Sequence, residues 1–570
     1  MKKHKFIDIC VRAEGEEAFF ELCEKIAENN FEFEGIPNLA YRSNNNIIIN
    51  TNTPVYSKSL DIYPSPYLTG EYDYLLKVDH SYQTIIETNR GCPFLCTFCY
   101  WGRGGTTNKY RFRSLDTIYK ELDYFSEKKI EYVFNADSNF GMHKRDYDIA
   151  LKIVENKTGS GYPEKFRTCW GKNTSKRIFK ISSLMHYYEL DKGMTLARQS
   201  NNKEVLKNIK RDNIKLEAYS ILQKKFNLIN VPVYAEMILG LPGESYTSWK
   251  DGIDELLESG LNNQLYVYQA EVYPNTELGN KDYQKKFGIV TKRTQLNEIH
   301  CSPRDQKWLN EFQEIVIQTN TMSINDWRKM TTYSILTMLL HSMKIGFFVL
   351  TYLHYQHKIK YSTLLEIIIN SKTPFISELI ELSNSYTGGL LQGKGRGILL
   401  KKYSDVYLEP EEVSFFKVFE NLDIFYSELY GVFKKLIDKT FHNELSEIIR
   451  FQKIHIPIYK RKEESAIHHF KSDIPFFAYN IARNKIGSIS SQPRTIIIYT
   501  DGFKSRHEFA KKKLIWSRKS GTILKSSDFS LEIEEASKKT FNIENFDREE
   551  TFKISLFDKS REKFEKFSAI

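Results

Sequence analysis

Three cysteines on one short loop are the residues of this 570-residue sequence best suited to chemistry. They are Cys92, Cys96 and Cys99, spaced C-x3-C-x2-C. Cysteine thiolates bind thiophilic centres such as zinc and iron–sulfur clusters. A structural zinc ion normally needs four protein ligands, and Cys169 and Cys301 stand alone, far from any second C-x2-C. The array therefore favours a 4Fe–4S cluster whose fourth iron is left open, which indicates a reactive site.

Strands and helices must position this loop. Residues 82–87 predict a strand before it, and a helix starts near Ser114. The strand-like segments are residues 84–88, 131–136, 166–171, 193–199, 231–239 and 263–271. The amphipathic segments between them are residues 114–128, 145–156, 174–187, 203–228 and 245–259. Six such repeats predict an α/β fold with a parallel sheet and right-handed crossovers. In such folds the chemistry gathers where strands end and loops begin.

The loop and its flanks, ETNRGCPFLCTFCYWG, resemble the radical S-adenosylmethionine (radical SAM) family. The hallmark of that family is C-x3-C-x-aromatic-C, which Cys92, Cys96, Phe98 and Cys99 match position for position. The flanking residues look most like the branch that carries a cobalamin-binding domain before the radical core. The resemblance implies a partial (β/α)6 barrel. It also implies a 4Fe–4S cluster on the three cysteines, with S-adenosylmethionine as cofactor and Phe98 beside it.

The resemblance extends to the ends of three further strands. Asp137 and Asn139 stand where the family, often through Gly-Gly-Glu, holds the methionyl amino group. Gly-Gly-Glu is absent here, and an Asx turn is the alternative. Lys172 faces either the cofactor carboxylate or solvent. Gln199 or Ser200 occupies the position that binds the ribose hydroxyls, with capping of the next helix as the alternative.

Glu236 is a carboxylate inside an apolar strand, residues 231–239, that runs into the turn Gly-Leu-Pro-Gly-Glu. In the family this strand lies along the adenine, so the resemblance implies that Glu236 lies at the cofactor. A carboxylate in an apolar strand is costly unless it is paired or hydrogen-bonded. A structural ion pair is therefore the alternative role.

The first 50 residues resemble only the last part of a cobalamin-binding domain. The phrases VRAEGEEAF and IPNLAYR match its final strand, helix and exit hairpin, and residues 5–12 predict a buried strand at an edge. The pattern D-x-H-x-x-G, which ligates cobalamin, does not occur in the sequence. We therefore expect that the chain alone does not hold cobalamin in the usual way. Either it is a natural short form, or its start was lost by gene splitting.

The sequence divides into five parts. They are a remnant of a doubly wound α/β domain (1–50), a linker (51–81), the radical SAM core (82–300), a mostly helical domain (301–490) and a mixed, charged tail (491–570). Residues 330–355 predict a buried helical hairpin. The longest charge-free run there covers 14 residues, which is short of the ~18 that a membrane span requires.

The composition limits which binding partners and which cellular compartment we expect. A net charge of +10, from 82 Lys and Arg against 72 Asp and Glu, is a mild excess for this length, so we expect no nucleic-acid partner. Seven cysteines without secreted-type spacing indicate a reducing compartment. No signal peptide or membrane span is evident, so we expect a cytoplasmic protein. The expected partners are a small-molecule substrate and an electron donor such as flavodoxin or ferredoxin.

The sequence thus predicts a radical SAM enzyme. One electron from the cluster would cleave S-adenosylmethionine, and the 5′-deoxyadenosyl radical would abstract hydrogen from an unidentified substrate. Two alternatives remain. The first is a cobalamin-dependent methyltransferase whose cobalamin half is missing or supplied in trans. The second is a non-catalytic metal-binding module.

Overall fold

Two parallel sheets form the centre of the computed structural model. The structure describes residues 1–2, 4–44, 46–52, 59–77, 82–101, 109–171, 175–191, 193–229, 231–305, 307, 309–482 and 487–516. The first sheet has the order β4 (Gln83–Ile86), β7 (Tyr132–Phe140), β8 (Lys165–Trp170). The second has the order β11 (Gln264–Gln269), β10 (Val233–Leu239), β9 (Met194–Gln199). Every pair within these two sheets is parallel, which confirms a mixed α/β fold with parallel strands.

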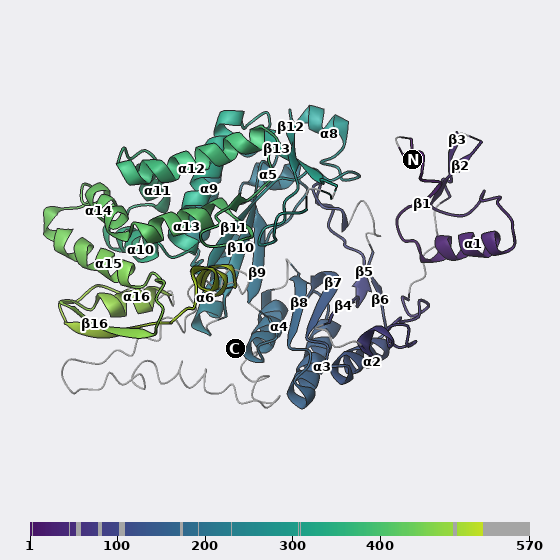
Figure 1. Ribbon diagram of the computed structural model, residues 1–570, viewed down its shortest axis with the longest axis horizontal. Coiled ribbons are helices and arrows are strands. Elements are labelled where there is room, and N and C mark those ends of the chain that lie inside the picture. The colour runs from purple at the N-terminus through teal and green to yellow at the C-terminus, as the bar shows by residue number, and fades with distance from the viewer. Residues whose placement is uncertain are drawn as a thin grey trace.

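The two sheets meet between β8 and β9, which lie side by side in Figure 1. Among the described residues no ladder joins these two strands. The backbone N–H of Phe166 instead donates to the carbonyl of Leu190, just before β9, at 2.7 Å. The single continuous sheet predicted from the six repeats is therefore divided into two halves of three strands.

Helices follow the strands as the sequence predicts. They are α2 (Leu115–Glu127), α3 (Arg145–Ser160), α4 (Ser175–Tyr187), α5 (Lys203–Asn208), α6 (Leu216–Leu228) and α7 (Tyr246–Glu258). Side-chain caps fix where two of them start: the Ser114 hydroxyl accepts from the Thr117 N–H, and Ser245 forms a capping box with Ser248.

One predicted helix was wrong. The segment predicted as a single helix over 203–228 is two helices, because the chain turns away after α5. Lys210 has φ of 56°, in the left-handed region. The Asn213 amide then donates to the carbonyls of Arg198 and Ser200, at 2.8 and 3.0 Å, and holds the connecting loop against the end of β9.

Alternation along the strands gives the sheets two different faces. On β10, Val233, Ala235, Met237 and Leu239 are buried in the core. The residue between the second and third of these, Glu236, faces a cavity instead. The core is continuous with the helices that cover that side. The opposite side is the one on which polar residues gather.

The N-terminal residues form a small unit of their own, at the right of Figure 1. Its elements are β1 (Ile9–Val11), α1 (Glu16–Ala27), β2 (Leu39–Ser43) and β3 (Asn46–Ile49), with antiparallel strands in the order β1-β2-β3. The predicted buried strand over 5–12 is wrong in extent and burial. Only the three residues of β1 pair with β2, and all three are half-buried. The polar Asp8 and Arg12 flank them and limit the length of the strand. Phe6 lies outside it and is 80% exposed.

Beyond residue 280 the chain is mostly helical. The helices are α8 (Lys281–Lys286), α9 (Ile324–Thr337), α10 (Phe347–His357), α11 (Tyr361–Ile369), α12 (Pro374–Leu391), α13 (Pro410–Glu420), α14 (Leu422–Phe433), α15 (His442–Ile454), α16 (Ile474–Ala482) and α17 (Arg506–Phe509). Three antiparallel pairs accompany them: β12 (Val290–Gln295) with β13 (Phe312–Gln318), β14 (Ile398–Leu399) with β15 (Tyr407–Leu408), and β16 (Glu464–Phe470) with β17 (Arg494–Thr500). The strands of the first pair lie on either side of residue 300, the predicted boundary between the radical SAM core and the helical domain. The third pair joins the predicted helical domain to the predicted tail.

The two buried helices predicted over 330–355 are present, but they meet near a right angle and do not form a hairpin. Helix α9 continues through a π-helical turn, Met338–Ser342, and meets α10 at 91°. This bent pair is the one place in the described chain where length and composition would suit a span, and no single described helix is long and apolar enough to cross a membrane. Residues 330–353, which include the bend, are all buried.

Candidate cluster and cofactor site

The three cysteines lie on the loop that leaves β4. A short antiparallel ribbon of β5 (Asn89–Arg90) and β6 (Arg111–Phe112) closes the base of this loop. Cys92 and Cys96 are buried, and Cys99 is half-buried. Thr97 fixes the loop to two other segments. Its N–H donates to the Ile209 carbonyl at 3.0 Å, and its carbonyl accepts from the Leu278 N–H at 2.8 Å. Two distant segments therefore hold the loop in place.

The donor set fits an iron–sulfur cluster. All three cysteines are free of disulfides. No group of three or more His, Cys, Asp or Glu side chains converges to hold a single metal ion in the described part of the chain. A single zinc ion would need such convergence. A 4Fe–4S cluster does not, because each thiolate binds a different iron. Three thiols on one loop can each bind one iron of such a cluster and leave the fourth iron open.

Asn139, near the end of β7, lies against the first cysteine. Its side-chain amide donates to Cys92 Sγ at 3.3 Å and to the Ser138 hydroxyl at 2.9 Å. The Asn139 Oδ1 atom is buried and has no hydrogen-bond partner in the described structure. A buried acceptor without a donor is costly. The ammonium group of a cofactor bound at the open iron would satisfy it.

Asp137, two residues earlier, has a different environment. Its buried carboxylate accepts from the Thr88 N–H and hydroxyl, from the Asn89 N–H and side-chain amide, and from the Asn135 amide. Burial raises the pKa of Asp137 to about 7, and these hydrogen bonds oppose the rise. The side chain thus ties β7 to the start of the cysteine loop.

Gln199 and Ser200, at the end of β9, point in different directions. Gln199 lines the cavity described below, and its φ of 64° places a non-glycine residue in the left-handed region. Such strain is concentrated at functional sites. Ser200 is fully buried, and its hydroxyl donates to Glu244 Oε2 at 2.7 Å. Glu244 in turn accepts from Ser248 at 2.5 Å, so Ser200 belongs to a buried network at the start of α7.

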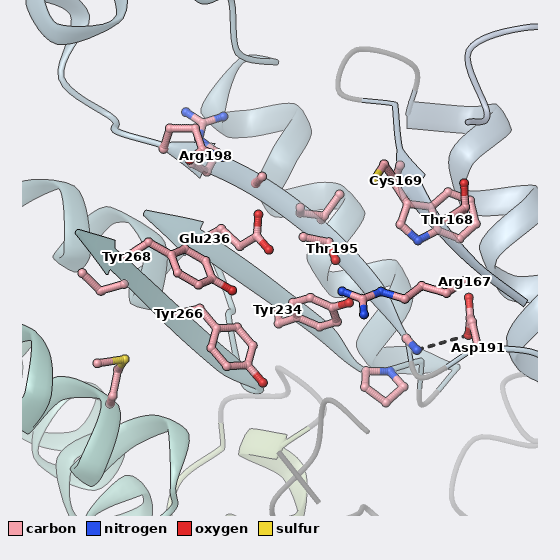
Figure 2. Close-up of a pocket in the computed structure, with 18 of the residues that line it drawn as sticks. Arg167, Thr168, Cys169, Asp191, Thr195, Arg198, Tyr234, Glu236, Tyr266 and Tyr268 are labelled. Atoms are coloured by element: carbon pink, nitrogen blue, oxygen red, sulfur yellow. Dashed lines mark hydrogen bonds between the residues drawn. The ribbon is translucent and has the colours of Figure 1, made fainter. Parts of the chain in front are cut away.

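A cavity of 1570 Å³ runs along the polar face of the two sheets. This sheet cavity is larger than the roughly 300–1,000 Å³ of usual ligand pockets. Figure 2 shows Arg167 and Cys169 on β8 facing Tyr234 and Glu236 on β10 across it. The neighbouring tyrosines surround Glu236, and burial raises the pKa of Tyr234, so its phenol stays protonated. The cavity therefore offers both charged and aromatic walls.

Phe98 is not among the described residues that line this cavity. Phe98 is half-buried and packs against the central core. Lys172 lies outside the described residues.

Sequence reasoning missed Arg211. The loop between α5 and α6 brings this residue beside Cys96, where burial lowers the pKa of the guanidinium and the nearby thiol opposes the shift. Arg211 also donates to the Ala197 carbonyl at 2.7 Å and to Asn213 Oδ1 at 2.9 Å. Arg211 therefore places a positive charge beside one of the three predicted cluster ligands. The available signal was the polar break, Lys210 to Asn213, inside an otherwise helical pattern.

Comparisons with known proteins agree with this geometry. Residues 86–265 match the model of the Radical SAM superfamily. The 2-(S-pantetheinyl)-carbapenam-3-carboxylate methyltransferase of Streptantibioticus cattleyicolor is 32% identical over 370 residues, which are 64% of this chain and 54% of that protein. The cobalamin-dependent radical SAM methyltransferase TokK of Streptomyces tokunonensis is 31% identical over 371 residues, with the same coverage of both chains.

The chain therefore spans about half the length of the curated relatives it matches. Among solved structures, the radical S-adenosylmethionine methyltransferase TsrM of Kitasatospora setae gives a TM-score of 0.42 at 14% identity, over 57% of this chain and 66% of that one.

The match over residues 86–265 contains the whole cysteine loop and most of the strands whose ends surround it. This segment is therefore a radical SAM domain. The cofactors of that class are a 4Fe–4S cluster and S-adenosylmethionine.

Proposed function

We propose that this chain is the radical core of a cobalamin-dependent radical SAM methyltransferase that acts on a small molecule. The observation that carries the proposal is a three-cysteine loop held by two distant segments, with an unpartnered amide oxygen beside Cys92. Over 64% of its length the chain is 32% and 31% identical to two methyltransferases, one of them the cobalamin-dependent radical SAM methyltransferase TokK. The size of the sheet cavity supports a substrate bound together with the cofactor.

The finer architecture belongs to this proposal. The two halves, β4-β7-β8 and β9-β10-β11, would together form a partial (β/α)6 barrel, because β8 and β9 are adjacent and all pairs are parallel. The small N-terminal unit would be the remnant of a doubly wound domain. Both assignments rest on the order of the elements and on the family resemblance.

Each site residue then has a role. Cys92, Cys96 and Cys99 would hold the cluster, and Arg211 would lie beside Cys96 as a positive charge next to the cluster. When bound, the cluster would supply the electron that cleaves the C5′–S bond of S-adenosylmethionine to give a 5′-deoxyadenosyl radical. Asn139 would accept from the methionyl ammonium group. Gln199 would contact the ribose from the end of β9.

The other predicted residues receive supporting roles. Glu236 would lie along the cofactor from the middle of β10, as a cavity-facing residue. Lys172 and Phe98 remain candidates for cofactor contacts from the ends of β8 and of the cysteine loop. Asp137 and Ser200 would position the loop and the start of α7 through their buried hydrogen bonds. A flavodoxin- or ferredoxin-like protein would supply the electron.

Cobalamin would have to be supplied by protein outside this sequence, either a further segment or a second chain. The sequence contains no D-x-H-x-x-G pattern, and it covers about half of its relatives. The same missing pattern favours a second candidate, a radical SAM enzyme that works without cobalamin. The two candidates differ in whether the methyl group of S-adenosylmethionine is transferred.

The experiment is anaerobic reconstitution with iron and sulfide, followed by reduction and addition of S-adenosylmethionine, with and without hydroxocobalamin loaded on a cobalamin-binding domain that is added as a second chain. Mass spectrometry would quantify 5′-deoxyadenosine and S-adenosylhomocysteine. We expect 5′-deoxyadenosine in both reactions, and S-adenosylhomocysteine only with cobalamin. 5′-Deoxyadenosine alone in both reactions would favour the second candidate. The absence of both products would contradict both candidates.

A further inference from the structure

We infer that the sheet cavity binds an elongated small molecule through a terminal carboxylate, which Arg167 holds at the end of the cavity away from the cysteine loop. This inference rests on the proposed function and adds the chemical class of its substrate. Three observations support the inference. They are the hydrogen-bond and ion-pair partners of the arginines that line the cavity, the position of Arg167 along β8, and the tyrosines on the opposite wall.

The first observation concerns the arginines that line the cavity. Arg198 is occupied, because it donates to Asn201 Oδ1 at 2.7 Å and to the Ile214 carbonyl at 2.6 Å. Arg396 forms an ion pair with Glu409. Arg167 has no carboxylate within ion-pair distance among the described residues. The phenols of Tyr132 and Tyr234 are its polar neighbours instead.

The charge of Arg167 is therefore available to a ligand. Burial lowers the pKa of its guanidinium, and the two phenols more than offset this, so the group stays charged. Lys165, two residues earlier, is already bound to the Glu189 carbonyl at 2.6 Å. One guanidinium with phenol neighbours suits a carboxylate, which it can bind in bidentate geometry. A phosphate dianion would call for more than one free cation.

The second observation is position. Arg167 pairs in register with Phe134, whereas Asn139, the residue against Cys92, lies five positions further along β7. Arg167 is also four residues before Gly171, where β8 has ended at the cluster side of the sheet. Four residues of strand correspond to roughly 13 Å. A group held at Arg167 is therefore well separated from the cluster, and its reacting carbon must lie on the order of 10 Å away.

The third observation is the wall that such a molecule would follow. Tyr234 and Tyr266 pack edge to face at 5.7 Å between ring centroids, and Tyr266 and Tyr268 stack at 6.3 Å. Figure 2 shows these three rings beside Glu236 and opposite Arg167. Aromatic side chains bind flat or apolar bodies through large, rigid surfaces. The wall leads from the carboxylate end toward the cluster end of the cavity.

The test uses ligand-observed ¹⁹F NMR on the reconstituted protein in the presence of S-adenosylmethionine. The probes share one aromatic body: 4-(4-fluorophenyl)butyrate, the neutral 4-(4-fluorophenyl)butanamide, the cationic 4-(4-fluorophenyl)butylamine and 3-(4-fluorophenyl)propyl phosphate. We expect the butyrate to bind about tenfold or more tightly than the amide, because a charge-assisted hydrogen bond is lost in the amide. The amine should bind least.

Three variants assign that preference. Arg167→Gln should remove the advantage of the butyrate over the amide, and Arg167→Lys should keep part of it, since it retains the charge. Lys176→Gln removes the same charge from an exposed position on α4 and should leave the preference unchanged. The cluster spectrum of each variant shows whether the loop is intact.

Several results would overturn the inference. They are equal binding of butyrate and amide, no saturable binding by any probe, tighter binding of the phosphate than of the butyrate, or an unchanged preference in Arg167→Gln. A loss of S-adenosylmethionine affinity in Arg167→Gln, measured by calorimetry, would place Arg167 at the cofactor instead. A failure of the proposed function is distinct, because it would appear as absent 5′-deoxyadenosine in the parent protein.

Discussion

At the residue scale, the thiols of this protein differ in their surroundings. Cys92 accepts from the Asn139 amide, and Cys96 lies beside the Arg211 guanidinium. Both neighbours stabilise negative charge on sulfur. Cys169 sits on the cavity wall, and Cys301 is exposed on the loop between β12 and β13. These surroundings distinguish the two proposed cluster ligands, Cys92 and Cys96, from Cys169 and Cys301, which we do not expect to bind the cluster.

Replacing Cys92, Cys96 or Cys99 with alanine should abolish the cluster, because each thiolate binds its own iron. We expect loss of the broad absorbance near 400 nm and of bound iron after anaerobic reconstitution. The control variants Cys169→Ala and Cys301→Ala should keep both signals. A variant lacking all three loop cysteines that still shows a 4Fe–4S spectrum would contradict the assignment.

Asn139→Ala and Gln199→Ala should weaken S-adenosylmethionine binding without removing the cluster. A lost neutral hydrogen bond costs about 0.5–1.5 kcal/mol, and one to a charged group about 1.5–3. Asn139→Ala should therefore have the larger effect, because it would lose the ammonium contact. Calorimetric titration of the reconstituted variants measures both.

The matched control for that titration is Ser200→Ala, adjacent to Gln199 but turned toward Glu244. Its cofactor affinity should equal that of the parent protein. If Ser200→Ala loses affinity while Gln199→Ala does not, the assignment of these two neighbours is reversed.

Sequence alone identified the residue types at the site but not their contacts. The cysteine spacing and the strand ends are local patterns, so they could be read directly. The role of Asp137 depends on Thr88 and Asn89, which lie 49 and 48 positions away in the chain. The unpartnered oxygen of Asn139 and the approach of Arg211 to Cys96 depend on packing in the same way. Such contacts follow from the folded backbone and not from spacing.

At the element scale, the strands and helices of the core were predictable because their periods differ. Alternation on β10 and the three-to-four residue spacing on α2 mark one buried face each. The break between α5 and α6 was not predicted. The polar residues Lys210–Asn213 were a weak signal for it, and the hydrogen bonds of Asn213 to the end of β9, which fix the loop, could not be predicted from the sequence. The lack of a ladder between β8 and β9 in the described structure was likewise not predicted, because it depends on how the two halves of the sheet pack together.

The bend between α9 and α10 contains a buried lysine that should make stability depend on pH. Lys344 Nζ donates to the Asn262 carbonyl and lies 3.6 Å from the centre of the Phe347 ring. Burial lowers its pKa to about 7, whereas an unfolded chain keeps this proton up to pH about 10.4. The unfolded state therefore binds more protons in this window. Stability should rise with pH between about 7 and 10, by at most about 1.4 kcal/mol per pH unit.

Lys344→Met should flatten that dependence and raise the thermal midpoint at pH 7, because no ammonium group is then desolvated on folding. Thermal unfolding at pH 7 and pH 9.5 measures both effects. Lys372→Met, at an exposed position before α12, is the control and should behave as the parent protein. A pH dependence that persists unchanged in Lys344→Met would assign it to another group.

At the scale of the whole molecule, the N-terminal unit is attached to the core through charge. Glu14 pairs with Arg90, at 2.9 Å, and with Arg111, and these side chains are largely buried. Glu16 adds a second contact to Arg90 at 2.6 Å. Both arginines lie on the ribbon that closes the cysteine loop. The unit therefore contacts the base of the candidate cluster site.

Glu14→Gln should loosen this attachment, because Glu14 is the carboxylate shared by Arg90 and Arg111. Breaking a buried ion pair costs up to roughly 3–5 kcal/mol. The loss should be smaller here, because Arg90 keeps its contacts with Glu16 and Glu87. Limited trypsin digestion should then release the first ~50 residues several-fold faster than from the parent protein. Glu21→Gln makes the same charge change on the exposed side of α1 and should not alter the rate. Equal release from both variants would mean that other contacts hold the unit.

The most direct test of the account is formation of 5′-deoxyadenosine by the reconstituted, reduced protein. The account predicts that the parent chain produces it from S-adenosylmethionine under anaerobic conditions, and that the variant with Cys92, Cys96 and Cys99 all replaced by alanine produces none. 5′-Deoxyadenosine formed equally by both proteins, or by neither, would contradict the proposal that this cysteine loop is the centre of a radical SAM enzyme.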